Sequence, residues 1–275
     1  MNQRILLHEI KGQGEPIVLV PGGLSGWLSW IPHAERLSAH RKVIRVQLRS
    51  IELAEAGKPF PNDYKPSTEV EGLRATVDEL GLESFDLAGW SYGGLVALTF
   101  ALDNPERVRT LTVIEPAAGW IVRETGHAAR ALAESEKVER SLEGQEVSVD
   151  NLKEFLVRVG VATPGEDFEA MPQWPVWVRN RQVLSLNGTI YEYEDSLERL
   201  RALEVPILAV KGSEGSEDLT TIVDDLVANT PHSRLLELSG GHACHIEDID
   251  RFLKELSKHA ATGDFESTEG WKPRL

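Results

Sequence analysis

The chain has 275 residues, of which 41% are hydrophobic, enough to bury the core of one large domain or of one domain with an insertion. Its formal net charge of −15 and lack of a dense Lys/Arg run argue against binding to nucleic acid or anionic membranes. The first residues do not resemble a signal peptide, no apolar run is long enough to span a bilayer, and the single cysteine cannot form an intrachain disulfide, so we expect a cytoplasmic protein.

Short apolar runs alternate with helical patterns along most of the chain. This alternation predicts an α/β fold, with a mostly parallel sheet of about seven strands and helices on both faces. The predicted strands are residues 4–10, 16–20, 42–48, 84–88, 108–114, 206–210 and 234–238. The predicted helices between them are residues 28–38, 68–80, 92–102, 218–229 and 248–259.

The alternation stops between about residues 117 and 201. This stretch has helical patterns at 127–143, 151–159 and 196–203 and no convincing buried strand. We therefore predict a helical cap, residues 117–201, inserted between two parts of an α/β core, residues 1–116 and 202–260. The remaining residues, 261–275, form a polar tail with several glycine and proline residues.

The segment Gly89-Trp90-Ser91-Tyr92-Gly93 matches the motif G-x-S-x-G. It directly follows a predicted strand and opens a predicted helix, which is the context that a nucleophilic serine requires. A tight turn there holds the serine oxygen out of the backbone, and it leaves no room for a Cβ at Gly89 or Gly93. The motif and its context predict Ser91 as a nucleophile rather than a solvated serine in a glycine-rich turn.

With this motif, the chain resembles the α/β-hydrolase superfamily from about residue 4 to residue 259. The resemblance implies an α/β-hydrolase fold, here with one strand fewer than is usual at the start. A Rossmann dinucleotide site is excluded, because the loop Pro21-Gly22-Gly23-Leu24 lacks a spaced third glycine. The chain also has no phosphate-binding G-x-x-x-x-G-K-[ST] motif.

The resemblance also implies an oxyanion hole. Attack on an ester places negative charge on the carbonyl oxygen, and two backbone N–H groups normally stabilise it. By similarity with the family, one donor is Tyr92, the residue after the nucleophile. The second is Gly23, or alternatively Leu24, unless this loop is an ordinary glycine-rich turn.

The family places its catalytic histidine between the last strand and the last helix, where this chain has Gly240-Gly241-His242. His242 is therefore the expected general base. A metal site at His242, Cys244 and His245 is disfavoured, because the spacing supplies two histidine ligands at best and H-E-x-x-H is absent. We expect neither a metal nor an organic cofactor.

The triad acid departs from the commonest family pattern. Its usual position after the penultimate strand is Gly215, so the acid has to come from elsewhere. Some family members take it from the end of the strand next to the nucleophile strand, which here ends in Glu115. Glu115 is the predicted acid, and the competing carboxylates are Glu214, Glu217 and Asp218.

A serine nucleophile points to acyl transfer on a small-molecule ester or lactone. Epoxide hydrolases and haloalkane dehalogenases of this fold need an aspartate in place of Ser91, so both are excluded. Two alternatives stay open, a hydrolase of carbon–carbon bonds in diketone-like substrates and a ligand-binding receptor without turnover. Five tryptophans are predicted to line a largely apolar pocket, although core packing explains each equally well: Trp27, Trp90, Trp120, Trp174 and Trp177.

Overall fold

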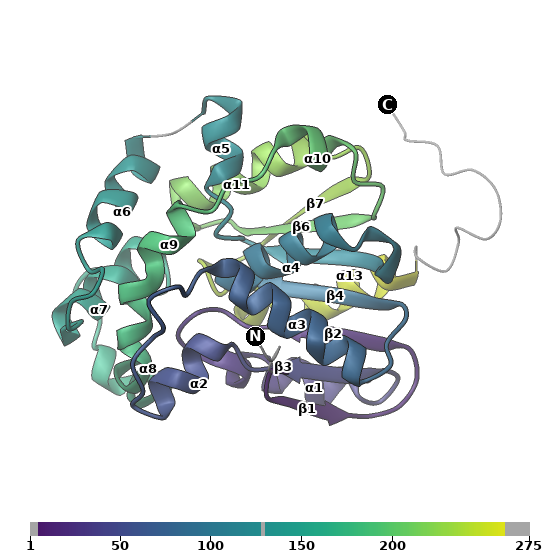
Figure 1. The fold of residues 1–275 in the computed structure, drawn as a ribbon, viewed down its shortest axis with the longest axis horizontal. Coiled ribbons are helices and arrows are strands. Elements are labelled where there is room, and N and C mark those ends of the chain that lie inside the picture. The colour runs from purple at the N-terminus through teal and green to yellow at the C-terminus, as the bar shows by residue number, and fades with distance from the viewer. Residues whose placement is uncertain (1–4, 128–129, 262–275) are drawn as a thin grey trace.

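The computed structural model describes residues 5–127 and 130–261, so nearly all of the predicted tail lies outside the described residues. Its centre is a seven-stranded sheet in the order β1-β3-β2-β4-β5-β6-β7 (Figure 1). All neighbouring strands are parallel except β1 and β3, which confirms the expected mostly parallel sheet. The strands are β1 (His8–Lys11), β2 (Pro16–Val20), β3 (Lys42–Val46), β4 (Phe85–Trp90), β5 (Val108–Ile114), β6 (Ile207–Gly212) and β7 (Ser233–Leu238).

Side chains of the central strands alternate between two apolar cores, one on each face of the sheet. In β2, Val18 and Val20 lie in a core that also holds side chains of α3, α4 and α11. Ile17 and Leu19 of the same strand lie in the other core, with α1 and α13. These helices are α1 (Ile31–Leu37), α3 (Pro66–Glu79), α4 (Tyr92–Asp103), α11 (Glu217–Ala228) and α13 (Ile249–Ala260).

Between β5 and β6 the described residues form helices and no strand. Four of these helices, α6 to α9, form a group at the left of Figure 1. None of the helices in the described part of the chain is both long and apolar enough to cross a membrane. The segment contains α5 (Trp120–Thr125), α6 (Arg130–Arg140), α7 (Val149–Arg158), η3 (Phe168–Ala170), α8 (Trp174–Asn180), η4 (Arg181–Leu186), α9 (Asn187–Tyr191) and α10 (Leu197–Arg201).

Outside the segment between β5 and β6, two short α-helices were not predicted, α2 (Arg49–Glu55) and α12 (Cys244–Glu247). The start of α2 is capped from a distant part of the chain. The carboxylate of Glu69, on α3, accepts hydrogen bonds from the backbone N–H groups of Arg49 (2.8 Å) and Ser50 (2.9 Å). Because the capping residue Glu69 lies 20 residues after Arg49, no local sequence signal marks the start of this helix.

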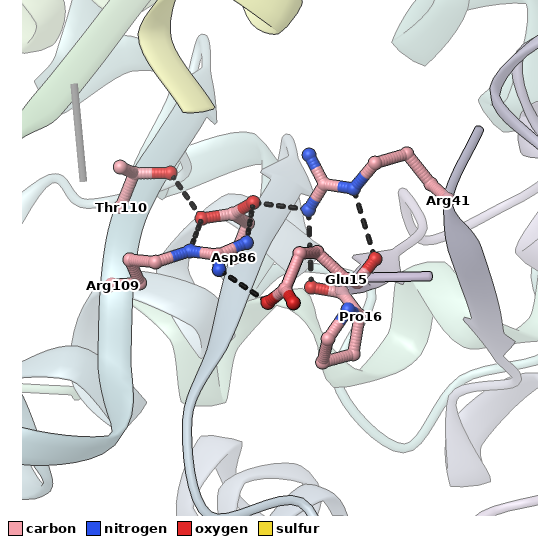
Figure 2. A network of polar contacts seen from close by, with 6 residues as sticks. All are labelled: Glu15, Pro16, Arg41, Asp86, Arg109 and Thr110. Carbon is pink, nitrogen blue, oxygen red and sulfur yellow. Dashed lines mark hydrogen bonds and ion pairs between the residues drawn. The ribbon is translucent and has the colours of Figure 1, made fainter. Parts of the chain in front are cut away.

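A buried polar network joins the amino ends of four strands (Figure 2). At its centre is Asp86 of β4, whose side chain is 2% exposed. Arg109 of β5 donates to both carboxylate oxygens, from Nε (3.0 Å) and Nη2 (2.7 Å), and Arg41 donates to Oδ2. Arg41 also donates from Nε to the carbonyl oxygen of Glu15 (2.9 Å), next to β2. The network therefore ties β2, β4 and β5 to the segment that leads into β3.

Charge and burial act in opposite directions on Asp86. Burial alone would raise its pKa, but the hydrogen bonds and positive charges of Arg109 and Arg41 outweigh burial and hold the pKa below its usual value. A depressed folded-state pKa means that the carboxylate contributes stability above its unfolded-state pKa. That contribution is lost as the pH falls through the folded-state pKa.

Asp86→Asn is therefore expected to lower the free energy of unfolding at pH 7 by about 3–5 kcal/mol, because the poorly exposed guanidinium groups of Arg41 and Arg109 lose their buried carboxylate, and Arg109 keeps only the exposed carboxylate of Glu15. The difference from the wild type should shrink as the pH falls below about 4, the unfolded-state pKa, because the unfolded chain then binds a proton that the folded carboxylate still excludes. Urea unfolding at several pH values measures both effects.

The matched control is Asp78→Asn, which removes a carboxylate that is 55% exposed and paired with Arg107. This exposed pair should cost no more than about 1 kcal/mol. Equal losses for the two variants, or an Asp86→Asn loss that stays constant down to pH 3, would contradict a stabilising role for the buried network.

Candidate active site

Ser91 lies in a strained turn between β4 and α4, with φ 55° and ψ −120°. Positive φ is unusual for a residue other than glycine and marks a turn that its surroundings enforce. A Cβ on Gly89 would lie 2.2 Å from the carbonyl oxygen of Gly93, and a Cβ on Gly93 would lie 2.2 Å from that of Pro21. Both glycines are therefore required by the close packing of β4, the start of α4 and the loop after β2.

The loop after β2 faces the first residue of α4. A Cβ on Gly23 would lie 4.0 Å from Cβ of Tyr92, and both residues line the same cavity as Ser91. The first N–H groups of a helix have no acceptor within the helix. Within the described residues, neither the N–H of Tyr92 nor that of Gly23 donates a backbone hydrogen bond outside regular elements. The site therefore has two backbone N–H groups beside Ser91 that can donate hydrogen bonds to a negatively charged oxygen.

The side chain of Tyr92 is held by a chain of hydroxyl contacts that leads to Glu69. Its hydroxyl lies 3.0 Å from the hydroxyl of Tyr64, which donates to Oε1 of Glu69 (2.6 Å). Burial raises the pKa of both tyrosines well above the usual value, so both hydroxyls stay protonated. The first residue of α4 is thus connected through Tyr64 to the carboxylate that caps α2, an arrangement that the sequence did not indicate.

His242 follows β7 and lies against Glu115 at the end of β5. Its Nδ1 is 2.7 Å from Oε2 of Glu115, and the two side chains are 4% and 0% exposed. The other carboxylate oxygen, Oε1, accepts the N–H of Gly212 at 2.8 Å. With Nδ1 donating to the carboxylate, Nε2 is the nitrogen that is available to a reacting group.

The backbone of His242 is held from both sides. Its N–H donates to the carbonyl oxygen of Gly160 (3.0 Å), which follows α7, and its carbonyl oxygen accepts the Trp90 indole N–H (2.9 Å). The Trp90 and His242 rings also pack at 5.3 Å between centroids. The contact with Gly160 shows that the helical segment between β5 and β6 reaches the histidine, and no motif in the sequence indicated it.

Glycine at position 215 leaves room for Glu115. A Cβ on Gly215 would lie 2.4 Å from Oε1 of Glu115, so the two positions cannot both carry side chains in this arrangement. Of the competing carboxylates, Glu214 and Glu217 are exposed. The third, Asp218, accepts hydrogen bonds from Ser135 Oγ (3.0 Å) and from the N–H of Leu219 (3.0 Å). The structure therefore brings Glu115, and none of these three, to His242.

Ser91, His242, Gly23 and Tyr92 line one cavity of about 110 Å³. Much of its remaining wall consists of apolar side chains from the segment between β5 and β6. The set includes Leu132, Phe155, Leu156, Val159, Val161, Trp177, Val183, Leu184 and Ile190.

Only two of the five tryptophans named from the sequence line this cavity, Trp90 and Trp177. The indole N–H of Trp177 also donates to Ser25 Oγ (2.8 Å), which ties α8 to the loop after β2. The other three differ from the expectation. Trp120 is buried in the main core, Trp174 packs on Phe168, and Trp27 is half-buried outside the cavity lining. Large indoles suit core packing as well as pockets, so composition alone could not separate the two uses.

The cavity wall also includes polar residues that sequence analysis did not single out. Charged residues on a helix normally face solvent. No local sequence pattern indicates that charged residues of several helices face one another here. The set comprises Ser135, Glu139, Arg158, Asn187 and Tyr191.

Several known hydrolases are similar to this chain in sequence or in structure. The chain is 35% identical over 111 residues to 2-hydroxy-6-oxo-2,4-heptadienoate hydrolase of Pseudomonas putida, covering 39% of each chain. It is 26% identical over 259 residues to pimeloyl-(acyl-carrier protein) methyl ester esterase of Aliivibrio salmonicida, covering 92% of this chain and 95% of that protein. The structure of a thermophilic esterase from Thermogutta terrifontis superposes with a TM-score of 0.73 and 21% identity, over 94% and 93% of the two chains.

The esterase superposition, at this identity, establishes a shared fold only. The family model described as "Alpha/beta hydrolase family" matches residues 17–255, which is most of the chain and includes Ser91, Glu115 and His242. The protein belongs to the alpha/beta hydrolase family.

Proposed function

We propose that this protein hydrolyses carboxylic esters or lactones through a covalent acyl-enzyme on Ser91. The observation that carries the proposal is the pairing of His242 Nδ1 with Glu115 Oε2 at 2.7 Å, because His242 lines the same cavity as Ser91 on its strained turn. A serine is a weak nucleophile until a base accepts its proton, and a base works best when a third group orients it.

In the proposed reaction, Nε2 of His242 takes the proton of Ser91 Oγ as that oxygen attacks the carbonyl carbon. The backbone N–H groups of Gly23 and Tyr92 stabilise the resulting oxyanion, and Glu115 stabilises the imidazolium. Collapse of the intermediate breaks the ester C–O bond, and His242 returns the proton to the departing alcohol. A water molecule then attacks the acyl-enzyme as His242 takes its proton, and His242 returns that proton to Ser91 Oγ when the C–O bond to Ser91 breaks and the acid leaves.

The helical segment 117–201 acts as a cap over this reaction in the proposal. Its residues supply much of the cavity wall, and Gly160 and Trp177 connect it to His242 and to the loop after β2. An apolar wall excludes water and favours a hydrophobic acyl or lactone group.

A second candidate is hydrolysis of a carbon–carbon bond in a diketone-like substrate. It is favoured by the partial match to a relative named for the hydrolysis of 2-hydroxy-6-oxo-2,4-heptadienoate. Both reactions would use Ser91 and His242, so cleavage of simple esters does not separate them. Comparison of kcat/KM for esters, lactones and a vinylogous diketone acid does. The receptor alternative arose from the vacant acid position, and the pairing of Glu115 with His242 argues against it.

Ser91→Ala should abolish ester hydrolysis while it preserves the fold, because only a hydroxyl group is removed. Loss of a catalytic serine costs on the order of 10⁶-fold in kcat. Turnover of p-nitrophenyl esters measures the loss, and a fluorophosphonate probe should label the wild type on Ser91 but not the variant. Residual turnover above a few per cent, or labelling at another residue, would refute the proposed nucleophile.

Glu115→Gln keeps the size of the side chain but removes the charge that offsets the imidazolium. By analogy with the Asp-to-Asn change in a serine protease, kcat should fall by up to about 10⁴-fold. The matched control is Glu214→Gln, which changes an exposed carboxylate in the turn after β6 and should leave kcat within about twofold of the wild type. If Glu214→Gln is the slow variant, the acid has been assigned to the wrong residue.

Gly215→Ala tests the same assignment without touching Glu115. The added Cβ would lie 2.4 Å from Oε1, so the carboxylate has to move away from His242. We expect lower kcat together with a stability loss of about 1–3 kcal/mol, as is typical of overpacking. Glu214→Ala, the neighbouring change, should have neither effect. A Gly215→Ala enzyme with wild-type kcat and thermal stability would mean that Glu115 is not held where the proposal needs it.

A further inference from the structure

The cavity that holds Ser91 has a polar wall that the proposed acyl chemistry does not use. We define this polar wall as six residues from four helices. Ser135 and Glu139 lie one turn apart on α6, and Asn187 and Tyr191 lie one turn apart on α9, so each pair shares a helix face. The other two members are Arg158, the last residue of α7, and Asp218, in the first turn of α11. All six line the cavity.

Hydrogen bonds and an ion pair connect most of the polar wall. The Glu139 carboxylate, only 2% exposed as a residue, is paired with Arg158 and accepts a hydrogen bond from the Asn187 amide. Asp218 accepts the hydroxyl of Ser135 at 3.0 Å. These contacts leave Tyr191 apart, since its hydroxyl makes no side-chain hydrogen bond within the described part of the chain. A ligand that reaches the wall therefore meets one free hydroxyl beside two carboxylates.

The polar wall carries a net negative charge, because two carboxylates face one guanidinium that is already paired. Burial raises the pKa of Tyr191, and the nearby charges of Glu139 and Asp218 raise it further, so this hydroxyl stays protonated. Arg158 Nε is buried without a hydrogen-bond partner among the described residues, so the wall keeps donors of its own, and its preference for a cation rests on the net charge. A buried negative surface attracts donors and cations and repels anions.

We propose that the polar wall is a subsite for the non-reacting end of the substrate, and that it selects a hydroxyl or ammonium group and rejects a carboxylate. This inference rests on the proposed function, since it assumes that the reacting ester binds at Ser91 in the same cavity. It adds a substrate class to that function, namely esters or lactones with an apolar body and a hydrogen-bond donor at the far end.

The test uses four p-nitrophenyl esters of six-carbon acids, which end in a methyl, hydroxyl, ammonium or carboxylate group. For the wild type, kcat/KM should be highest for the hydroxyl or ammonium ester and lowest for the carboxylate ester. Asp218→Asn removes one charge and keeps an acceptor for Ser135. It should lower the ammonium-to-carboxylate ratio of kcat/KM by about tenfold. Tyr191→Phe, which removes only the hydroxyl, should lower the hydroxyl-to-methyl ratio by about two- to tenfold.

Asp224→Asn is the matched control, because Asp224 is on the same helix, is 53% exposed and pairs with Lys211 outside the cavity. All four of its rates should equal those of the wild type. The structural alternative, in which the wall only holds the cap helices together, predicts lower thermal stability with unchanged ratios among the four esters. Unchanged ratios in both Asp218→Asn and Tyr191→Phe, or a wild-type preference for the carboxylate ester, would overturn the subsite.

A binding readout separates failure of the subsite from failure of the proposed function. Thermal unfolding of the Ser91→Ala protein should shift upward with hexylamine and less with hexanoate, without any turnover. If none of the esters reacts but hexylamine stabilises this protein through Asp218, the subsite stands and the esterase proposal fails. If the esters react and hexylamine has no greater effect than hexanoate, the subsite is refuted and the esterase proposal stands.

Discussion

The contact between Glu115 and His242 is the constraint on which the rest of the site depends. A carboxylate that is 0% exposed needs a hydrogen bond to each of its oxygens. Here one oxygen accepts the backbone N–H of Gly212 and the other accepts the Nδ1–H of His242. To reach that position, Glu115 takes a positive φ of 38°, and residue 215 has to be glycine. The Glu115 carboxylate thus connects the carboxyl ends of β5 and β6 with the loop after β7.

The parallel sheet keeps the Ser91 site apart from the Asp86 network. Ser91, Glu115 and His242 follow the carboxyl ends of β4, β5 and β7, whereas the Asp86 network joins the amino ends of β2, β4 and β5. Parallel strands place all their carboxyl ends at one edge, which is where open α/β sheets bind their ligands. The Asp86 network fixes the opposite edge, so it can stabilise the sheet without placing further charges beside the reacting atoms.

The segment between β5 and β6 gives the cavity its chemical character. It supplies the apolar side chains and five of the six polar-wall residues, and Gly160 connects it to the backbone of His242. Tyr92 is held in turn through Tyr64 to Glu69 and α2. The residues proposed to react are therefore supported by helices that are distant from them in sequence, and changes in those helices are expected to alter substrate preference.

The sequence by itself determined the strands of the sheet and located Ser91 and His242 after their strands, because these are local signals. Predicted strands 16–20 and 108–114 match β2 and β5 residue for residue, and G-x-S-x-G with its flanking strand and helix located the turn at Ser91. Because glycine stands at position 215, where the family usually has its catalytic acid, the sequence left a few other carboxylates as candidates. Only the tertiary structure decided which of them faces His242. It also decided which tryptophans reach the cavity, that Glu69 caps α2, and that Glu139, Arg158 and Asp218 share one wall. Each of these is a contact between side chains far apart in sequence, and periodicity specifies which face of an element is buried but not which partner it meets.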